Sequence, residues 1–381
     1  MKLAVRFAYR ADMMKLMLRL HVVAFALQIG SFSVFADDRL RKPDRIPSPP
    51  SDEQAALIRE GVALHDQRNF AGAIAQYKKV LTENPWEVNA LHELAFTYFE
   101  NKDFEAALDT ARRGAQCKCQ LLPAFHTMIG SALDELGKGS EAIETYRAAI
   151  RQNPRAAMLH YNLAISLRRA GKQSEAKTAA EDALHCDPSH RSSHAVLAAI
   201  YGDMGYRIPA ILAYSRFLTL EPESARATQV LPMLLNLLTR GVGKGKGQNE
   251  INIFLSETPK TRQDEGDFLS VEMMMSVGLA ADLITVPEQA KREPKTGFQK
   301  LVSIYTGMGE GLNLVKSKHG FAASYYAPYL AALTKAGHTE AFVAHAWKAG
   351  NIDGASDWAK ANPAKIEAFL AWSKDYQWPA K

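Results

Sequence analysis

Residues 157–190 read AMLHYNLAISLRRAGKQSEAKTAAEDALHCDPSH, and the architecture of the chain follows from this stretch. Its eighth and twentieth residues, Ala164 and Ala176, are small. Small residues at these places let two antiparallel helices approach closely, and Gly171 supplies the turn between them. Pro188 ends the second helix because proline cannot continue the helical hydrogen bonds. The stretch is therefore predicted to fold as a helical hairpin.

The same pattern recurs in the neighbouring sequence at a spacing of 34 residues, with one step of 35. Five repeats superpose in this register, at 54–87, 88–122, 123–156, 157–190 and 191–224. Their eighth residues are Gly61, Ala95, Gly130, Ala164 and Ala198, and their twentieth residues are Ala73, Ala107, Ala142, Ala176 and Ala210. One hairpin cannot bury its apolar face alone, so the repeats must stack. The second repeat departs from the pattern, because it lacks the closing proline and has an extra residue in the run CKCQLL from Cys117.

The five repeats resemble the tetratricopeptide repeat family over residues 54–224. The resemblance implies an all-α solenoid whose first helices line a concave groove for a protein or peptide partner. In the family the second, fifth, ninth, twelfth and thirteenth residues of each repeat face this groove. Carried onto this chain, the resemblance implies a peptide-binding groove with His92, Phe96, Phe99, Asp134, Tyr161, Arg168 and Arg169. Alternatively, Phe96 and Phe99 pack on a neighbouring helix.

The groove also lacks one feature of some relatives. These relatives hold the end of a peptide chain with a basic clamp, and this chain has Ile58 and Val62 where the clamp's Lys and Asn would stand. The resemblance therefore implies a peptide site without this particular ligand class.

Residues 1–36 have the order of a secretory signal peptide: basic residues, an apolar run and small residues before a cleavage site. The uncharged stretch from Leu20 to Ala36 has 17 residues, which is short for a spanning helix that needs about 20. We expect cleavage after Ala36, with an uncleaved anchor as the alternative, and a periplasmic or secreted protein with no stable membrane span. Translation starting at Met13 or Met14 is a further alternative. Residues 37–53 are rich in proline and predict an extended tether.

The repeat pattern is lost after Pro222. Residues 225–240 predict an apolar helix that caps the open end of the solenoid. Residues 241–381 predict a smaller, mostly helical domain of no identified family, in which GVGKGKG at 241–247 and the alternating run at 250–256 allow a short β-hairpin. Helices are expected at about 264–285, 296–318, 321–336, 338–348 and 363–376.

The charge of the chain is concentrated at one end. The formal net charge is +5, and residues 1–36 contribute +4 of it, from five basic residues and one acidic residue. The rest of the chain carries about equal numbers of both signs. It offers no electrostatic case for binding nucleic acid.

The sequence also gives no positive sign of catalysis, of a cofactor or of a bound metal. No G-x-S-x-G or H-E-x-x-H motif is present, and the glycine-rich run at 241–247 lacks the Lys-Ser/Thr ending of a P-loop. The fourth-position histidines stand one repeat apart, too far for one zinc ion, and are expected to pack between helices: His126, His160 and His194. Cys117, Cys119 and Cys186 are expected to be small buried side chains rather than ligands.

The sequence therefore predicts an exported binding or scaffolding protein of the cell envelope that is not an enzyme. The second hypothesis is an enzyme or carbohydrate-binding protein with a site between the solenoid and the C-terminal helices. A polar pocket with converging titratable groups would favour the second, and an open aromatic surface would favour the first.

Overall fold

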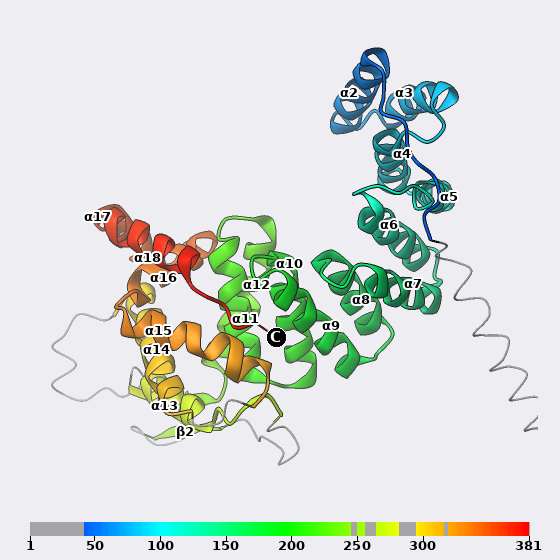
Figure 1. Cartoon of the computed structure of the whole chain (residues 1–381). Coiled ribbons are helices and arrows are strands. Elements are labelled where there is room, and N and C mark those ends of the chain that lie inside the picture. Colours follow the sequence, from blue (N-terminus) through cyan, green and yellow to red (C-terminus); the bar gives the residue numbers. More distant parts are fainter. Residues whose placement is uncertain (1–41, 245–249, 256–263, 282–294, 316–318, 381) are drawn as a thin grey trace, which may run out of the picture. The chain divides into compact units, whose positions relative to one another are not determined.

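A computed structural model describes residues 42–244, 250–255, 264–281, 295–315 and 319–380 (Figure 1). The predicted signal peptide and the first residues of the tether lie outside these ranges, as does part of the glycine-rich run. The backbone contacts divide the chain into two compact units, Met1–Ser166 and Leu167–Lys381, called unit 1 and unit 2 below. Each is described by itself.

Unit 1 is a series of helical hairpins in which each helix packs on the next. Its helices are α2 (Asp52–Asp66), α3 (Phe70–Glu83), α4 (Val88–Glu100), α5 (Phe104–Gly114), α6 (Leu122–Glu135), α7 (Gly139–Gln152) and the first part of α8 (Ala157–Arg169). The predicted all-α class is confirmed.

The hairpins close through small residues at the eighth position, as predicted. A Cβ added to Gly61 would lie 2.4 Å from a ring carbon of Tyr77, and one added to Gly130 would lie 2.3 Å from Tyr146. Each tyrosine stands at the twenty-fourth position of its repeat, so its ring fills the space that the glycine leaves open.

The turn within each hairpin is also the same in all five repeats. The fifteenth residue of each has a left-handed backbone, with φ between 61° and 80°: Arg68, Lys102, Gly137, Gly171 and Gly205. Glycine adopts this conformation without strain, whereas Arg68 and Lys102 adopt it at a cost.

The fourth-position histidines are buried, and two of them hold the turn that precedes their repeat. His160 Nε2 donates to the carbonyl oxygen of Pro154 at 2.9 Å, and His194 makes the same bond to Pro188 at 3.0 Å. His126 follows the repeat that lacks a closing proline, and its buried Nδ1 has no hydrogen-bond partner among the described residues. Burial lowers the pKa of His126 to about 4, so it is neutral at pH 7.

The irregular end of the second repeat holds the tether. Arg45 and Cys117 form a parallel β-bridge, in which the Lys118 amide donates to the Arg45 carbonyl at 2.8 Å. The Arg45 guanidinium also lies over the ring of Trp86, 4.9 Å from its centre. The described part of the tether is therefore bonded to unit 1.

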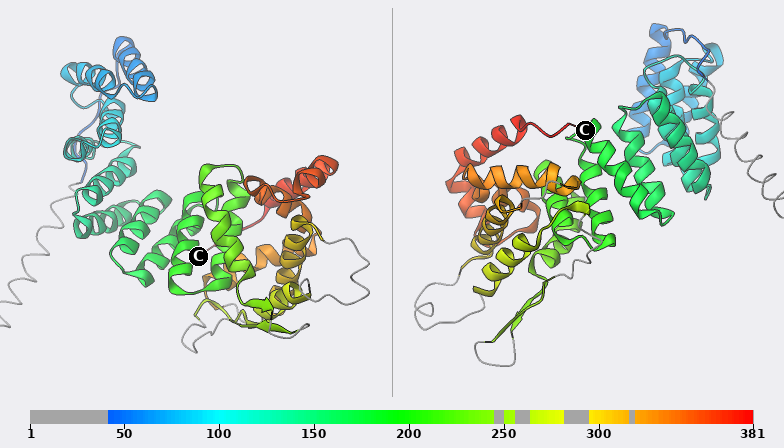
Figure 2. Two further views of the ribbon diagram at one scale, coloured as in Figure 1. Left: turned by 180° about the vertical axis from the view of Figure 1, so that it is seen from behind. Right: turned by 60° about the horizontal axis from the view of Figure 1, so that its bottom comes forward.

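Unit 2 contains the remaining repeat helices and the C-terminal helices (Figure 2). Its helices are the end of α8, α9 (Gln173–Cys186), α10 (Arg191–Met204), α11 (Arg207–Leu220), α12 (Ala225–Thr239), α13 (Leu269–Ala281), α14 (Gly297–Asn313), the π-helix η3 (Ala322–Tyr326), α15 (Ala327–Lys335), α16 (Thr339–Ala346), the short η4 (Lys348–Gly350), α17 (Ala355–Ala361) and α18 (Pro363–Asp375). The strands β1 (Val242–Lys244) and β2 (Ile251–Ile253) pair antiparallel, with Val242 opposite Ile253. The short hairpin that the sequence allowed is thus present.

Helix α11 forms the core of unit 2. Every residue from Arg207 to Thr219 is buried, and α11 contacts α10, α12, η3 and α16. Its Ser215 hydroxyl lies 2.9 Å from that of Tyr305 on α14. The second helix of the fifth repeat is therefore enclosed by the C-terminal helices, with no free outer face.

Candidate peptide-binding surface

The first helices of the repeats in unit 1 form a continuous surface, because α2 contacts α4 and α4 contacts α6. We call this the first-helix surface. Of the predicted groove residues, His92, Phe96 and Phe99 lie on α4 and Asp134 lies on α6. Tyr161 lies on α8 and is half-buried.

Phe96 is the most exposed ring of the predicted set, at 38% of its full accessibility. It stacks on His65 of α2, with ring centres 5.1 Å apart and planes 29° from parallel. His65 is itself held, because its Nδ1 lies 2.9 Å from the hydroxyl of the buried Thr97. The two rings form a small, rigid aromatic platform.

Sequence reasoning missed His65, although a signal was present. His65 is the twelfth residue of the first repeat, one of the positions that the family pattern assigns to the groove. Applying the pattern to the first repeat as well as to the second would have found it.

The other two rings on α4 are engaged in packing. Phe99 is half-buried and meets Phe104 of α5 edge to face, with ring centres 5.3 Å apart. His92 meets Phe125 edge to face at 6.0 Å, and its Nδ1 lies 3.1 Å from a carboxylate oxygen of Glu93. The alternative interpretation, packing on a neighbouring helix, thus describes Phe99 better than it describes Phe96.

Acidic residues border the first-helix surface of unit 1. Asp66, Glu100 and Glu135 are exposed and occupy the thirteenth position of three successive repeats. Asp134 stands beside Glu135 and accepts a hydrogen bond from the Ser166 hydroxyl. These side chains place four carboxylates on this surface, and the exposed Arg68 and Lys102 stand two residues after Asp66 and Glu100 in the turns.

The two predicted arginines belong to unit 2. The Arg168 Nε donates to a carboxylate oxygen of Asp203 on α10 at 2.7 Å, and both side chains are partly exposed. Arg169 is exposed at the end of α8. Unit 1 brings together the predicted aromatic and acidic residues, and the predicted basic residues are not part of that set.

Titratable groups do converge in unit 2, between repeat helices and the C-terminal region. We call Lys177, Glu181, Tyr201, Asp264 and Glu265 the Lys177 cluster. Lys177 pairs with Glu265, and its Nζ lies 3.3 Å from Asp264. The second oxygen of Glu265 accepts from the Tyr201 hydroxyl at 2.9 Å and from a backbone amide of η3 at 3.0 Å.

The pair of Lys177 and Glu265 at the centre of the Lys177 cluster is largely buried, whereas Asp264 at its edge is exposed. Glu265 is only 1% exposed, and both its oxygens have partners. Burial and the charge of Glu265 raise the pKa of Glu181 to about 8. Burial alone would lower the pKa of Lys177, but its hydrogen bond to Glu265 raises the pKa above the ordinary value. This arrangement joins helices and leaves no carboxylate facing solvent at Glu265.

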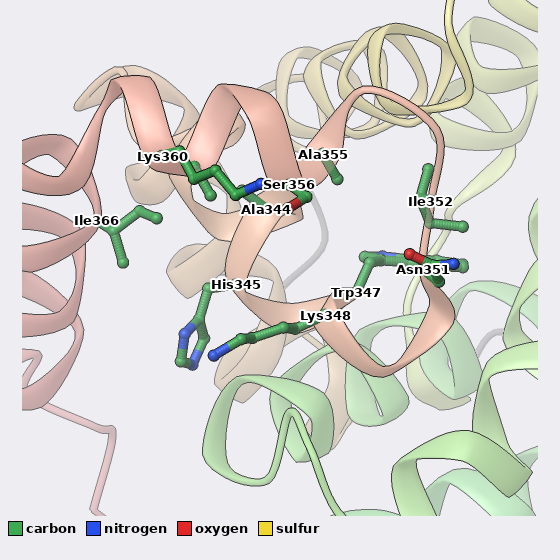
Figure 3. Close-up of a pocket in the computed structure, with 11 residues that line it drawn as sticks. Ala344, His345, Trp347, Lys348, Asn351, Ile352, Ala355, Ser356, Lys360 and Ile366 are labelled. Atoms are coloured by element: carbon green, nitrogen blue, oxygen red, sulfur yellow. The ribbon is translucent and has the colours of Figure 1, made fainter.

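A cleft of about 470 Å³ opens on the C-terminal helices of unit 2 (Figure 3). It is lined by Ala344, His345, Trp347, Lys348, Asn351, Ile352, Ala355, Ser356, Ala359, Lys360 and Ile366. No carboxylate lines it, and the Trp347 ring is buried rather than presented as a stacking platform. His345 Nε2 donates to the Thr219 carbonyl at 3.0 Å, which ties this nitrogen to α11. The cleft lacks the paired acid and base that hydrolysis would need.

Two features of the described ranges bear on metal binding and on membrane insertion. No group of three or more His, Cys, Asp or Glu side chains in them is arranged to hold a metal ion. None of their helices combines the length and apolar character needed to cross a bilayer.

Comparison with protein families identifies the repeats. Two family models described as tetratricopeptide repeat match this chain, one at residues 64–118 and the other at 127–191. The C-terminal helices lie outside both matches. No curated protein sequence matches the chain.

Several solved structures are similar. A thermophilic tetratricopeptide protein of Thermus thermophilus, TTC0263, is 21% identical, with a TM-score of 0.42 over 49% of this chain and 98% of that one. YrrB, described as a tetratricopeptide protein with an unusual peptide-binding site, is 17% identical, with a TM-score of 0.35 over 46% and 90%. MamA of Desulfovibrio magneticus RS-1 is 14% identical, with a TM-score of 0.37 over 45% and 97%.

Proposed function

This chain belongs to the tetratricopeptide repeat family, and we propose that unit 1 binds a protein or peptide on its first-helix surface. The observation that carries the proposal is the exposed ring of Phe96, stacked on His65. A rigid aromatic group that is already partly desolvated loses little entropy on binding and can act as a hot spot.

The charges support a particular class of ligand. Asp66, Glu100 and Glu135 place negative charge along the border of this surface. A complementary peptide has an apolar side chain to cover Phe96 and lysine or arginine residues near it.

We further propose that the protein has no catalytic role. The support is the burial of Glu265, both of whose oxygens have partners, and the lack of a carboxylate in the cleft of Figure 3. The enzyme hypothesis needs converging groups that a substrate can reach, whereas the convergence at Lys177 and Glu265 is largely buried and bonded internally.

Replacing Phe96 by alanine should weaken binding about thirtyfold, because a buried aromatic hot spot contributes about 2 kcal/mol or more. The measurement uses a displayed library of random peptides, selected on the wild-type protein, followed by titration of the best binders. We expect these binders to combine an apolar residue with lysine or arginine.

Lys78→Ala on α3 is the matched control, since Lys78 is exposed on a second helix. It should leave the affinity unchanged. Selected peptides that bind wild type and the folded Phe96→Ala protein equally would show that binding occurs elsewhere.

We also propose that the protein is exported. The support is the sequence order of residues 1–36, in which Lys15 and Arg19 precede an apolar run that ends at Ala36. Intact-mass measurement of the protein from an expressing bacterium should show a chain that begins at Asp37. A full-length chain in the cytoplasm would contradict export.

A further inference from the structure

Unit 2 buries an arginine that meets no carboxylate among the described residues. Arg216 on α11 is 5% exposed, and its guanidinium lies over two aromatic rings, 5.2 Å from the centre of Tyr329 and 4.8 Å from that of Trp378. One of its terminal nitrogens donates to the Ser373 hydroxyl at 2.9 Å. Its Nε is buried and has no acceptor in the part of the chain that the structure describes.

The neighbours of Arg216 do not neutralise its charge. No ion pair of the described residues includes it, and the groups around it are hydroxyls, rings and a histidine. That histidine, His194, donates from Nε2 to the Pro188 carbonyl, so its Nδ1 accepts from the Tyr326 hydroxyl at 2.7 Å. Burial also lowers the pKa of His194 to about 3, which keeps it uncharged. The site therefore holds the positive charge of Arg216 between largely aromatic walls, and the Nε of Arg216 has no hydrogen-bond acceptor among the described residues.

The cover of this site is a short extended segment. Residues 376–380 follow α18, and none of the backbone hydrogen bonds between described residues involves them. Trp378 holds the segment by ring contacts, stacking on Tyr329 at 5.0 Å and lying 4.7 Å from Tyr325. The indole remains partly exposed.

The contact between Trp378 and Arg216 combines a desolvation cost with a cation–π attraction, unlike the contacts of an apolar core. Covering the guanidinium removes it from water, which is costly when no counter-charge is supplied. The attraction between the cation and the two rings offsets only part of that cost. The indole is thus a good fit for the aromatic walls and an incomplete partner for Arg216.

We propose that Arg216, Tyr325, Tyr329 and Ser373 form a second ligand site, covered by Trp378, for a peptide that carries a carboxylate next to an aromatic side chain. The aromatic side chain of the ligand replaces the indole on Tyr329 and Tyr325. Its carboxylate accepts from the unpartnered Nε of Arg216 and supplies the missing negative charge. This site lies in unit 2 and is independent of the proposed first-helix surface.

The test uses the full chain with Trp378→Ala and two probes, acetyl-Tyr-Gln-Trp with a free terminal carboxylate and the same peptide as an amide. Both copy residues 376–378 of the chain. Titration calorimetry should show that Trp378→Ala binds the acid at least tenfold more tightly than the amide. The wild type should bind the acid at least tenfold more weakly than Trp378→Ala does, because its own Trp378 competes.

Two further variants serve as controls. Trp358→Ala removes another half-buried tryptophan of unit 2, which packs on Phe298, and should behave like wild type. Adding Arg216→Lys to Trp378→Ala should reduce the preference for the acid while the fold, followed by circular dichroism, is kept. Equal affinity for acid and amide, no binding to the folded Trp378→Ala protein, or equal gains from both tryptophan variants would each overturn the proposal.

Discussion

Replacing Glu265 by glutamine should lower the free energy of unfolding by about 3 to 5 kcal/mol, because it leaves the ammonium group of Lys177 partly buried without its main counter-charge. The Glu265 carboxylate accepts from Lys177, from Tyr201 and from the backbone at the start of η3. These partners come from α9, α10 and the C-terminal helices. The substitution therefore weakens the joint between repeat and C-terminal helices, and urea unfolding at pH 7 would measure the loss.

A double variant distinguishes the lost charge pair from lost packing. Lys177→Met added to Glu265→Gln removes both charges, while the glutamine oxygen still accepts from Tyr201 and from the backbone of η3, so it should recover most of the stability. In the wild type at pH 7 Glu181 is mostly protonated, because burial and the charge of Glu265 raise its pKa to about 8. A Glu265→Gln protein as stable as wild type would contradict a structural role for the cluster.

Gly130→Ala should cost about 1 to 3 kcal/mol of stability, the usual range for inserting a methyl group into a tightly packed core. The new Cβ would meet three ring atoms of Tyr146 at 2.3 to 2.8 Å, and the Tyr146 side chain is buried. The ring cannot stay in place, so Tyr146 or the helix that carries it must shift. Urea unfolding followed by circular dichroism measures the loss.

Other repeats of the chain suggest a matched control for Gly130→Ala. An alanine at the eighth residue goes with an alanine at the twenty-fourth in the second and fourth repeats, Ala95 with Ala111 and Ala164 with Ala180, whereas the fifth repeat has Ala198 with Tyr214. In a Tyr146→Ala background, Gly130→Ala recreates that pair and should be neutral or stabilise by up to about 1 kcal/mol, since alanine favours helix over glycine. The same loss in both backgrounds would show that the ring is not the obstacle.

Much of unit 1 could be predicted because its contacts are local. The small eighth residues, the turns at the fifteenth position and the twenty-fourth residues that face the eighth lie within one repeat, so the period of 34 residues describes them directly. The candidate surface was predictable in part by the same reasoning, since helical spacing places Phe96 and His92 on one helix face. The spacing could not tell that Phe99 packs on Phe104 and that Phe96 keeps its ring exposed.

The fifth repeat shows where the period stops being informative. Its second helix reads RIPAILAYSRFLTL, with apolar residues on all sides, unlike QSEAKTAAEDALHC in the fourth repeat. A helix that is apolar all round is normally enclosed. This contrast indicated a buried α11, but it could not indicate which helices enclose it.

The sequence by itself determined the hairpins, their order and the all-α class, because each repeat carries the contacts that fold it. The tertiary structure alone decided that Lys177 meets Glu265, 88 residues away, and that Arg216 meets Trp378. It also decided that Arg168 pairs with Asp203 within unit 2. The physical reason is that such pairs depend on where the non-repeating C-terminal helices pack. No period in the chain describes that packing, and only the closing of the long connections brings the partners together.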